Sequence, residues 1–122
     1  MNNTIYREEL LDHYQTPRNF KQLSKYTHSA AKANPLCGDQ LNFFLLIKNN
    51  RLQDIGFQGE GCVISMATAS ILSEYFKGQK TSDLLNFKTK ELLKKLQIQL
   101  TPTRLKCALL PLETIQSAIL NK

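Results

Sequence analysis

The alternation of apolar and polar positions in the middle of the chain predicts a β-hairpin. Residues 41–47 read LNFFLLI, an apolar and β-prone run, and residues 52–58 return as a second run. Between them stands KNNR, whose two asparagines tolerate the positive φ angles of a tight hairpin turn. Gly59 and Gly61 follow, and because glycine weakens a strand we expect the second strand to end there.

Apolar residues at helical spacing predict helices on both sides of the hairpin. The first helix is expected to begin at Thr4 and to end before Pro17, which cannot continue it. The polar and small residues from about 26 to 33 suggest a loop or a weak edge strand. After the hairpin, CVISMATASILSEYFKG at 62–78 predicts a second helix that ends at a glycine.

The C-terminal third of the chain reads as helical throughout. TSDLLNF at 81–87 is expected to form a short helical turn, and KTKELLKKLQIQL at 88–100 an amphipathic helix. A final helix is expected from about Thr103 to Leu120, and Pro111 inside it predicts a kink or a boundary. The predicted fold class is α+β: a small antiparallel three-stranded sheet packed against several helices.

Composition adds limits on the class of protein. The 122 residues are expected to form a single domain, 1–122, with 42% hydrophobic and 21% charged residues and a net charge of +6. The lysines are scattered, which indicates a solvated basic surface or a docking face for an acidic partner. Without a recognition motif, nucleic acid is not an expected partner. Neither a signal-peptide pattern nor an apolar run of membrane-spanning length is visible, so we expect a soluble cytoplasmic protein without membrane contact.

The three cysteines are the candidate chemical groups. An odd number of cysteines in a reducing cytosol argues against disulfides and leaves metal binding, nucleophilic chemistry or simple burial open. Cys37 lies in NPLCGDQ at the entry to a strand, Cys62 at the start of a helix, and Cys107 near the start of the last helix. A helix N-terminus favours thiolate over thiol, and Arg104 and Lys106 add positive charge beside Cys107.

Asp39 adds an oxygen ligand two residues after Cys37. In extended chain these two positions point to one side, so they are candidates to share a ligand. Three thiolates and one carboxylate match the four-ligand demand of zinc or of a cluster iron. Gaps of 25 and 45 residues between the cysteines are no zinc-finger signature, so the spacing by itself leaves the metal interpretation open.

Four blocks stand in order across nearly the whole chain: DHYQTPRNF, NPLCGDQ, FQGEGCVISMATAS and RLKCALLPLETI. Together they resemble the U-type iron–sulfur cluster assembly family, which comprises IscU, SufU and the N-terminal domain of NifU. The resemblance implies a SufE/NifU-like fold. It also implies that Cys37, Asp39, Cys62 and Cys107 surround one exposed site for Zn²⁺ or Fe²⁺ and for a transient [2Fe–2S] cluster.

The sequence combines features of two branches of that family. IscU-like scaffolds usually carry histidine where this chain has Lys106, and an LPPVK-like chaperone-binding stretch where it has LTPTR at 100–104. Arg104 and Lys106 instead resemble the SufU pattern. SufU proteins usually carry an insertion between the second and third cysteines, and the gap here has the shorter, IscU-like length.

By resemblance to SufU, the chain is expected to accept persulfide sulfur from a SufS/IscS-like cysteine desulfurase as a zinc-dependent sulfurtransferase. Cys37 is the implied acceptor, freed from zinc when a desulfurase histidine displaces it. Cys107 is the alternative if its helix start is exposed, and Arg104 would orient the site or the partner. One alternative is a non-enzymatic scaffold that passes a [2Fe–2S] cluster to apo iron–sulfur proteins or carriers. Another is a structural zinc module that binds a partner.

Overall fold

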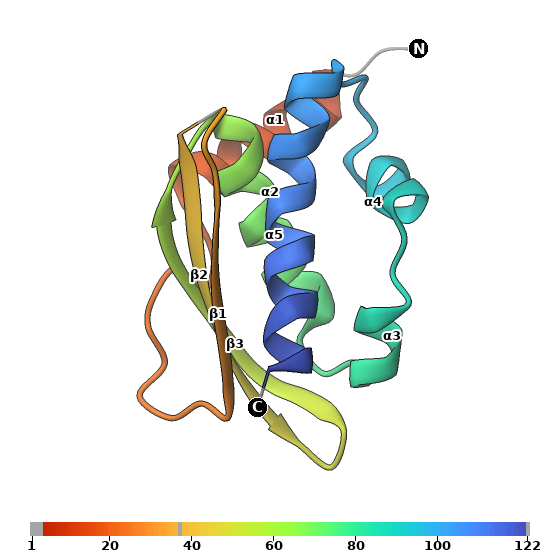
Figure 1. Ribbon diagram of the computed structural model, residues 1–122. Coiled ribbons are helices and arrows are strands. Elements are labelled where there is room, and N and C mark those ends of the chain that lie inside the picture. The colour runs from red at the N-terminus through yellow and green to blue at the C-terminus, as the bar shows by residue number, and fades with distance from the viewer. Residues whose placement is uncertain (1–3, 37, 122) are drawn as a thin grey trace.

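The computed structural model describes residues 4–36 and 38–121, in which helices pack against one three-stranded antiparallel sheet (Figure 1). The strands β1 (His28–Asn34), β2 (Asp39–Lys48) and β3 (Arg51–Glu60) stand in the order β1-β2-β3. The helices are α1 (Thr4–Gln15), α2 (Val63–Phe76), α3 (Thr81–Leu85), α4 (Thr89–Leu96) and α5 (Pro102–Leu120). The predicted α+β class is confirmed, and β1 is the edge strand that the polar segment suggested.

The β2–β3 hairpin forms where the apolar alternation placed it. Asn49 and Asn50 both have positive φ, 54° and 61°, which is the backbone that a two-residue turn between twisted strands requires. The turn sets the register, which pairs Phe43 with Phe57 and stacks their rings at a centroid distance of 5.3 Å. This register brings the start of β2 beside the end of β3, with Gln40 opposite Glu60.

Helices α2 and α5 cover one face of the sheet, and α3 and α4 lie on their far side (Figure 1). Burial of the inward-facing strand residues against these helices supplies the main hydrophobic stabilisation. The buried strand residues include Leu41, Phe43, Leu45, Leu52, Ile55 and Phe57. Helix α2 is apolar on most of its circumference because it lies between α1, α5 and the sheet.

The segment between α1 and β1 covers part of the opposite face of the sheet. Tyr26 packs edge-on against Phe44 on this face, whereas Phe20 forms a bridge with Phe57 along the outer edge of β3. Gly56 permits this crossing, because a Cβ at that position would collide with the backbone carbonyl of Lys21. Side chains therefore pack against both faces of the sheet in this region, which explains why Phe43 and Phe44, on opposite faces of β2, are both buried.

Strand β3 ends between the two glycines that were expected to break it, and of the two outcomes expected at Pro111, a kink or a boundary, the structure excludes the boundary. Strand β3 does not end at Gly59 but continues through it to Glu60, because a glycine at φ 147° lets the strand pass close to the carbonyl of Gln40. Helix α5 runs without a boundary through Pro111, which is buried. Pro111 cannot donate to the carbonyl of Cys107, but packing of α5 against the sheet and α2 holds the helix together.

A buried polar contact joins α1 to α2. His13 is 5% exposed, and its Nδ1 lies 2.7 Å from the hydroxyl of Ser70, which also accepts the backbone N–H of Arg18 at 2.8 Å. Burial lowers the pKa of His13 below its ordinary value of 6.5, and the nearby Arg18 guanidinium lowers it further. The folded protein therefore favours neutral His13.

We predict that the metal-free protein loses thermal stability as the pH falls below about 6.5, the ordinary pKa of histidine. A folded-state pKa below the unfolded one means that the unfolded chain takes up the proton more readily, so acid favours unfolding. The measurement is the melting temperature between pH 7.5 and 5.5. His13→Asn is expected to flatten the acid-side loss, whereas His28→Asn, at the other histidine, should leave it in place. An equal slope in His13→Asn and the parent chain contradicts the assignment.

Candidate metal centre

Three chemically active side chains from distant parts of the sequence meet at one end of the sheet. Asp39 is the first residue of β2, Cys62 precedes α2 as its N-cap, and Cys107 lies in α5. The register that places Gln40 opposite Glu60 carries Asp39 next to the turn from β3 into α2. One ligand atom from each of the three lies within 4.8 Å of the others, which is the separation of groups that can share a metal ion.

Asp39 connects the sheet to α2 through its carboxylate. It is 1% exposed, and its Oδ1 accepts the backbone N–H of Cys62 at 2.8 Å. Helix α2 receives no hydrogen bond from the side chain of its own N-cap residue, so Asp39 serves as the cap from another element. The helix N-terminus in turn stabilises the negative charge of this buried carboxylate. Its second oxygen, Oδ2, lies 3.8 Å from Cys62 Sγ and faces the sulfur groups.

Cys62 is partly exposed and lies between Asp39 and Ser65. Its Sγ is 3.8 Å from the hydroxyl of Ser65, and that hydroxyl donates to the Cys62 carbonyl at 3.2 Å. Gly61 makes this approach feasible: a Cβ there would collide with the Ser65 hydroxyl and lie 2.6 Å from Asp39 Oδ1. Gly61 is thus required by space, because bulk at this position would push apart the groups of the site.

Cys107 is fully buried, and its Sγ donates to the carbonyl of Thr103 at 3.6 Å. Helix α5 begins at Pro102, so Cys107 lies in the second turn of the helix and not at the free N–H groups of its start. The expected benefit from the helix N-terminus is therefore weaker than the sequence suggested. The exposure that would make Cys107 the sulfur acceptor is absent in this conformation.

Arg104 and Lys106 are exposed and line two different hollows beside the cysteines. Arg104 shares a hollow of about 980 Å³ with Cys62 and with apolar residues of α1 and of the segment before α5, including Tyr14. Lys106 lines a smaller hollow of about 280 Å³ with Asn34 at the end of β1. Both cations are thus open to solvent, and the two hollows share no lining residue.

The predicted ligand Cys37 lies outside the described residues, so its position in the site remains a prediction. The residues beside it are described: Leu36 is 73% exposed, and Gly38 has a φ of 70°, which other residues rarely adopt. With the ligand atoms of Asp39, Cys62 and Cys107 already close together, one further thiolate from this segment would complete a tetrahedral set. Two thiols and one buried carboxylate are a donor set that suits zinc and iron.

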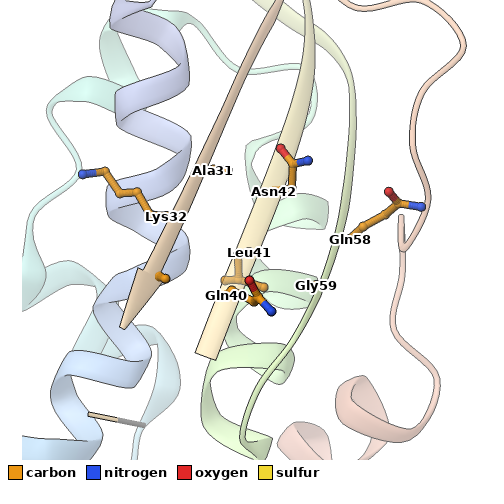
Figure 2. Close-up of a pocket in the computed structure, with 8 residues that line it drawn as sticks. Ala31, Lys32, Gln40, Leu41, Asn42, Gln58 and Gly59 are labelled. Atoms are coloured by element: carbon orange, nitrogen blue, oxygen red, sulfur yellow. The ribbon is translucent and has the colours of Figure 1, made fainter. Parts of the chain in front are cut away.

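Another hollow, of about 430 Å³, crosses the three strands next to this site (Figure 2). Figure 2 shows Gln40 and Asn42 on β2 and Gln58 on β3 along it. The lining offers amides and small side chains, and Gln40 also donates to Glu60 at 2.9 Å. It therefore lacks the sulfur and carboxylate ligands of the Asp39–Cys62–Cys107 cluster and is not a candidate for metal binding.

Sequence reasoning did not single out Ser65. Its position three residues after Cys62, at the start of a predicted helix, would have placed both on one helical face. That spacing is the signal that could have found it.

In the part of the chain that the structure describes, no helix has the length and apolar character needed to cross a membrane.

Comparisons with known proteins place the chain among iron–sulfur assembly proteins. A family model described as the NifU-like N terminal domain matches residues 5–121. The chain is 34% identical over 116 residues to the iron–sulfur cluster assembly scaffold protein IscU of Aquifex aeolicus, covering 93% of this chain and 73% of the relative. It is 36% identical over 83 residues to the zinc-dependent sulfurtransferase SufU of Bacillus subtilis, covering 68% and 56%.

The solved structures agree with this at the level of the fold. The crystal structure of the N-terminal part of a nitrogen-fixing NifU-like protein from Brucella abortus superposes with a TM-score of 0.75 at 16% identity. The match covers 96% of this chain and 93% of that one. The arrangement of one antiparallel sheet and its helices is thus shared by proteins that differ widely in sequence.

We predict that Gly61→Ala weakens zinc binding about tenfold or more, because relief of the collision with Asp39 and Ser65 shifts the turn that carries Cys62 away from the other ligands. The measurement is competition for zinc with a chromophoric chelator. Gly78→Ala is the control, since Gly78 has a φ of 91° but open space around its Cβ position. That variant should lose stability through backbone strain and keep the affinity of the parent chain. Equal zinc affinity in Gly61→Ala and the parent chain argues against the site.

Proposed function

The chain belongs to the NifU-like N-terminal domain family, and on that premise we propose that it accepts persulfide sulfur from a cysteine desulfurase for iron–sulfur cluster assembly. The observation that carries the proposal is the convergence of Asp39, Cys62 and Cys107, whose ligand atoms lie within 4.8 Å of one another. This cluster joins thiols to a buried carboxylate at one end of the sheet, and the partly exposed Cys62 gives access to it from solvent. We also propose that residues 1–122 act as one domain.

The proposed chemistry is a thiol exchange on sulfur. A thiolate of this chain attacks the terminal sulfur of the desulfurase persulfide, and a new S–S bond forms while the S–S bond of the donor breaks. The desulfurase cysteine leaves as a thiolate, so the exchange needs no external oxidant or reductant. We assign the acceptor role to Cys37 on the family resemblance. The burial of Cys107 supports the same choice, since a buried sulfur cannot meet a partner's persulfide without rearrangement.

Cys37, Asp39, Cys62 and Cys107 are the residues that we propose to hold the metal. Zinc bound there would keep the thiols deprotonated and the site folded between reaction cycles. Asp39 is the hard oxygen ligand in an otherwise sulfur set, and it is already engaged by the backbone N–H of Cys62. A carboxylate binds zinc less tightly than a thiolate does, so Asp39 would keep the site labile.

The proposed partners follow from charge and exposure. The chain has a net charge of +6, and Arg104 and Lys106 are exposed beside the cysteines, which suits an acidic face on a desulfurase. Arg104 borders the hollow that reaches Cys62, so we propose that it orients the incoming partner. We place this activity in the cytoplasm, where thiols stay reduced, and expect apo iron–sulfur proteins or carriers to receive the products.

A second candidate function is a scaffold on which a [2Fe–2S] cluster is built and passed on. It is favoured by the match of 116 residues to a protein named as an IscU scaffold, compared with 83 residues to SufU. The same four side chains would ligate the cluster. Tight stoichiometric zinc with faster desulfurase turnover supports sulfur transfer. Cluster formation on the protein and its transfer to an apo acceptor support the scaffold.

We predict that adding this protein stimulates a cysteine desulfurase of the SufS/IscS class and that Cys37→Ser abolishes the stimulation. The assay measures alanine release, alongside elemental analysis of the purified chain and mass spectrometry for one added sulfur. His28→Asn is the control and should stimulate as the parent chain does. Full stimulation by Cys37→Ser would contradict the acceptor role and point to a structural zinc module, whereas persulfide on Cys107 would move that role to Cys107.

We predict that Asp39→Ala and Asp39→Asn both slow zinc release to a chelator, because each removes the weakly held carboxylate ligand. The two variants differ in whether they keep the second role of Asp39, which is to cap helix α2. Asparagine keeps an oxygen that accepts the N–H of Cys62, whereas alanine removes the helix cap and should cost about 1 kcal/mol of unfolding free energy. Chemical denaturation of the metal-free proteins measures this difference. Unchanged or faster zinc release in both variants overturns the proposed lability.

A further inference from the structure

The hydroxyl of Ser65 is a polar group of the site that the proposed ligand set does not use. Ser65 lies in the first turn of α2, three residues after Cys62, and is fully buried. Its Oγ donates to the Cys62 carbonyl at 3.2 Å and lies 3.8 Å from Cys62 Sγ. One hydroxyl therefore reaches both the backbone and the sulfur of the same cysteine.

The hydrogen bonds that Cys62 Sγ can make depend on whether the sulfur carries a hydrogen. As a thiol, Cys62 has an S–H that can donate to Asp39 Oδ2 or to Ser65 Oγ, each at 3.8 Å. A sulfur bound to metal has no hydrogen and carries negative charge, so it can only accept a hydrogen bond from a donor. Asp39 cannot supply one, because an ionised carboxylate only accepts hydrogen bonds. Ser65 can, by turning its hydroxyl hydrogen from the carbonyl of Cys62 to its sulfur.

We propose that Ser65 is a positioning residue of the metal centre, whose hydroxyl donates a hydrogen bond to the Cys62 sulfur when that sulfur binds metal. This inference rests on the proposed function, because it assumes that Cys62 is a ligand. A hydrogen bond to a coordinated thiolate withdraws charge from the sulfur and weakens both its bond to the metal and its reactivity toward electrophiles. Ser65 thereby protects Cys62 as a resting ligand and leaves sulfur acceptance to another cysteine.

The close packing at Gly61 supports this assignment. Any side chain at Gly61 would collide with the Ser65 hydroxyl, so the site leaves that space to the hydroxyl and to Asp39. Thr68, one turn further along α2, provides a contrast. It is also fully buried, yet within the described residues its hydroxyl has no hydrogen-bond partner. The two hydroxyls thus share a helix and a degree of burial and differ in their contact with the sulfur.

The test uses the full chain loaded with Co²⁺, which reports thiolate ligands through sulfur-to-metal charge-transfer bands. We expect Ser65→Ala to move these bands to longer wavelength, because a sulfur without the hydrogen bond gives up charge more easily. We expect iodoacetamide to alkylate metal-bound Cys62 on the order of fivefold faster, as befits the loss of one typical hydrogen bond. Mass spectrometry of the peptides resolves Cys62 from the other cysteines.

Ser65→Thr keeps the hydroxyl and is expected to restore the spectrum and the alkylation rate of the parent chain. Thr68→Val removes the other buried hydroxyl with little change in shape and should leave both unchanged. If Ser65→Ala matches the parent chain in spectrum and alkylation, the role of Ser65 is wrong while the metal centre stands. If the parent chain shows no thiolate charge-transfer bands with Co²⁺, the metal centre itself, and with it the proposed function, fails.

Discussion

The hydrogen bond from the backbone N–H of Cys62 to Asp39 Oδ1 is the contact on which the site depends. It joins the first residue of β2 to the start of α2, the helix that follows directly after the neighbouring strand β3. Because the helix takes its cap from the sheet, the cap and the proposed ligand are the same side chain. One oxygen of Asp39 satisfies the helix, and the other lies 3.8 Å from a sulfur. Folding and ligand placement are thereby linked through one carboxylate.

Around this contact, the neighbouring groups give the two described cysteines different environments. Cys107 is fully buried in the second turn of α5, whereas Cys62 is partly exposed and borders the hollow that also contains Arg104. A buried sulfur suits a permanent ligand, whereas a sulfur at the rim of a hollow is accessible to molecules that enter the hollow. The Ser65 hydroxyl beside Cys62 fits a need to moderate that more accessible sulfur. The site thus combines a buried side with a solvent-accessible side.

The sequence predicted the fold well because the local signals agreed with one another. The two asparagines of the hairpin turn, the apolar run of β2 and the glycine after α2 each favour the structure that formed. The errors came at positions where tertiary packing overrides the local propensity of the residue. Gly59 reads as a strand end, yet β3 runs through it to bring two strands close together. Pro111 reads as a helix boundary, yet packing on both sides holds α5 continuous.

For the site, the sequence by itself determined the residue types and the family. The motifs around Cys37, Asp39, Cys62 and Cys107 named the ligand candidates, and the match to the NifU-like N terminal domain confirms the family. Only the tertiary structure decided which of these groups meet, how deeply each is buried, and that Ser65 and Gly61 belong to the same site. The physical reason is that these properties arise from residues far apart in the chain. The β2–β3 register and the packing of α5 bring them together, and no local pattern contains that information.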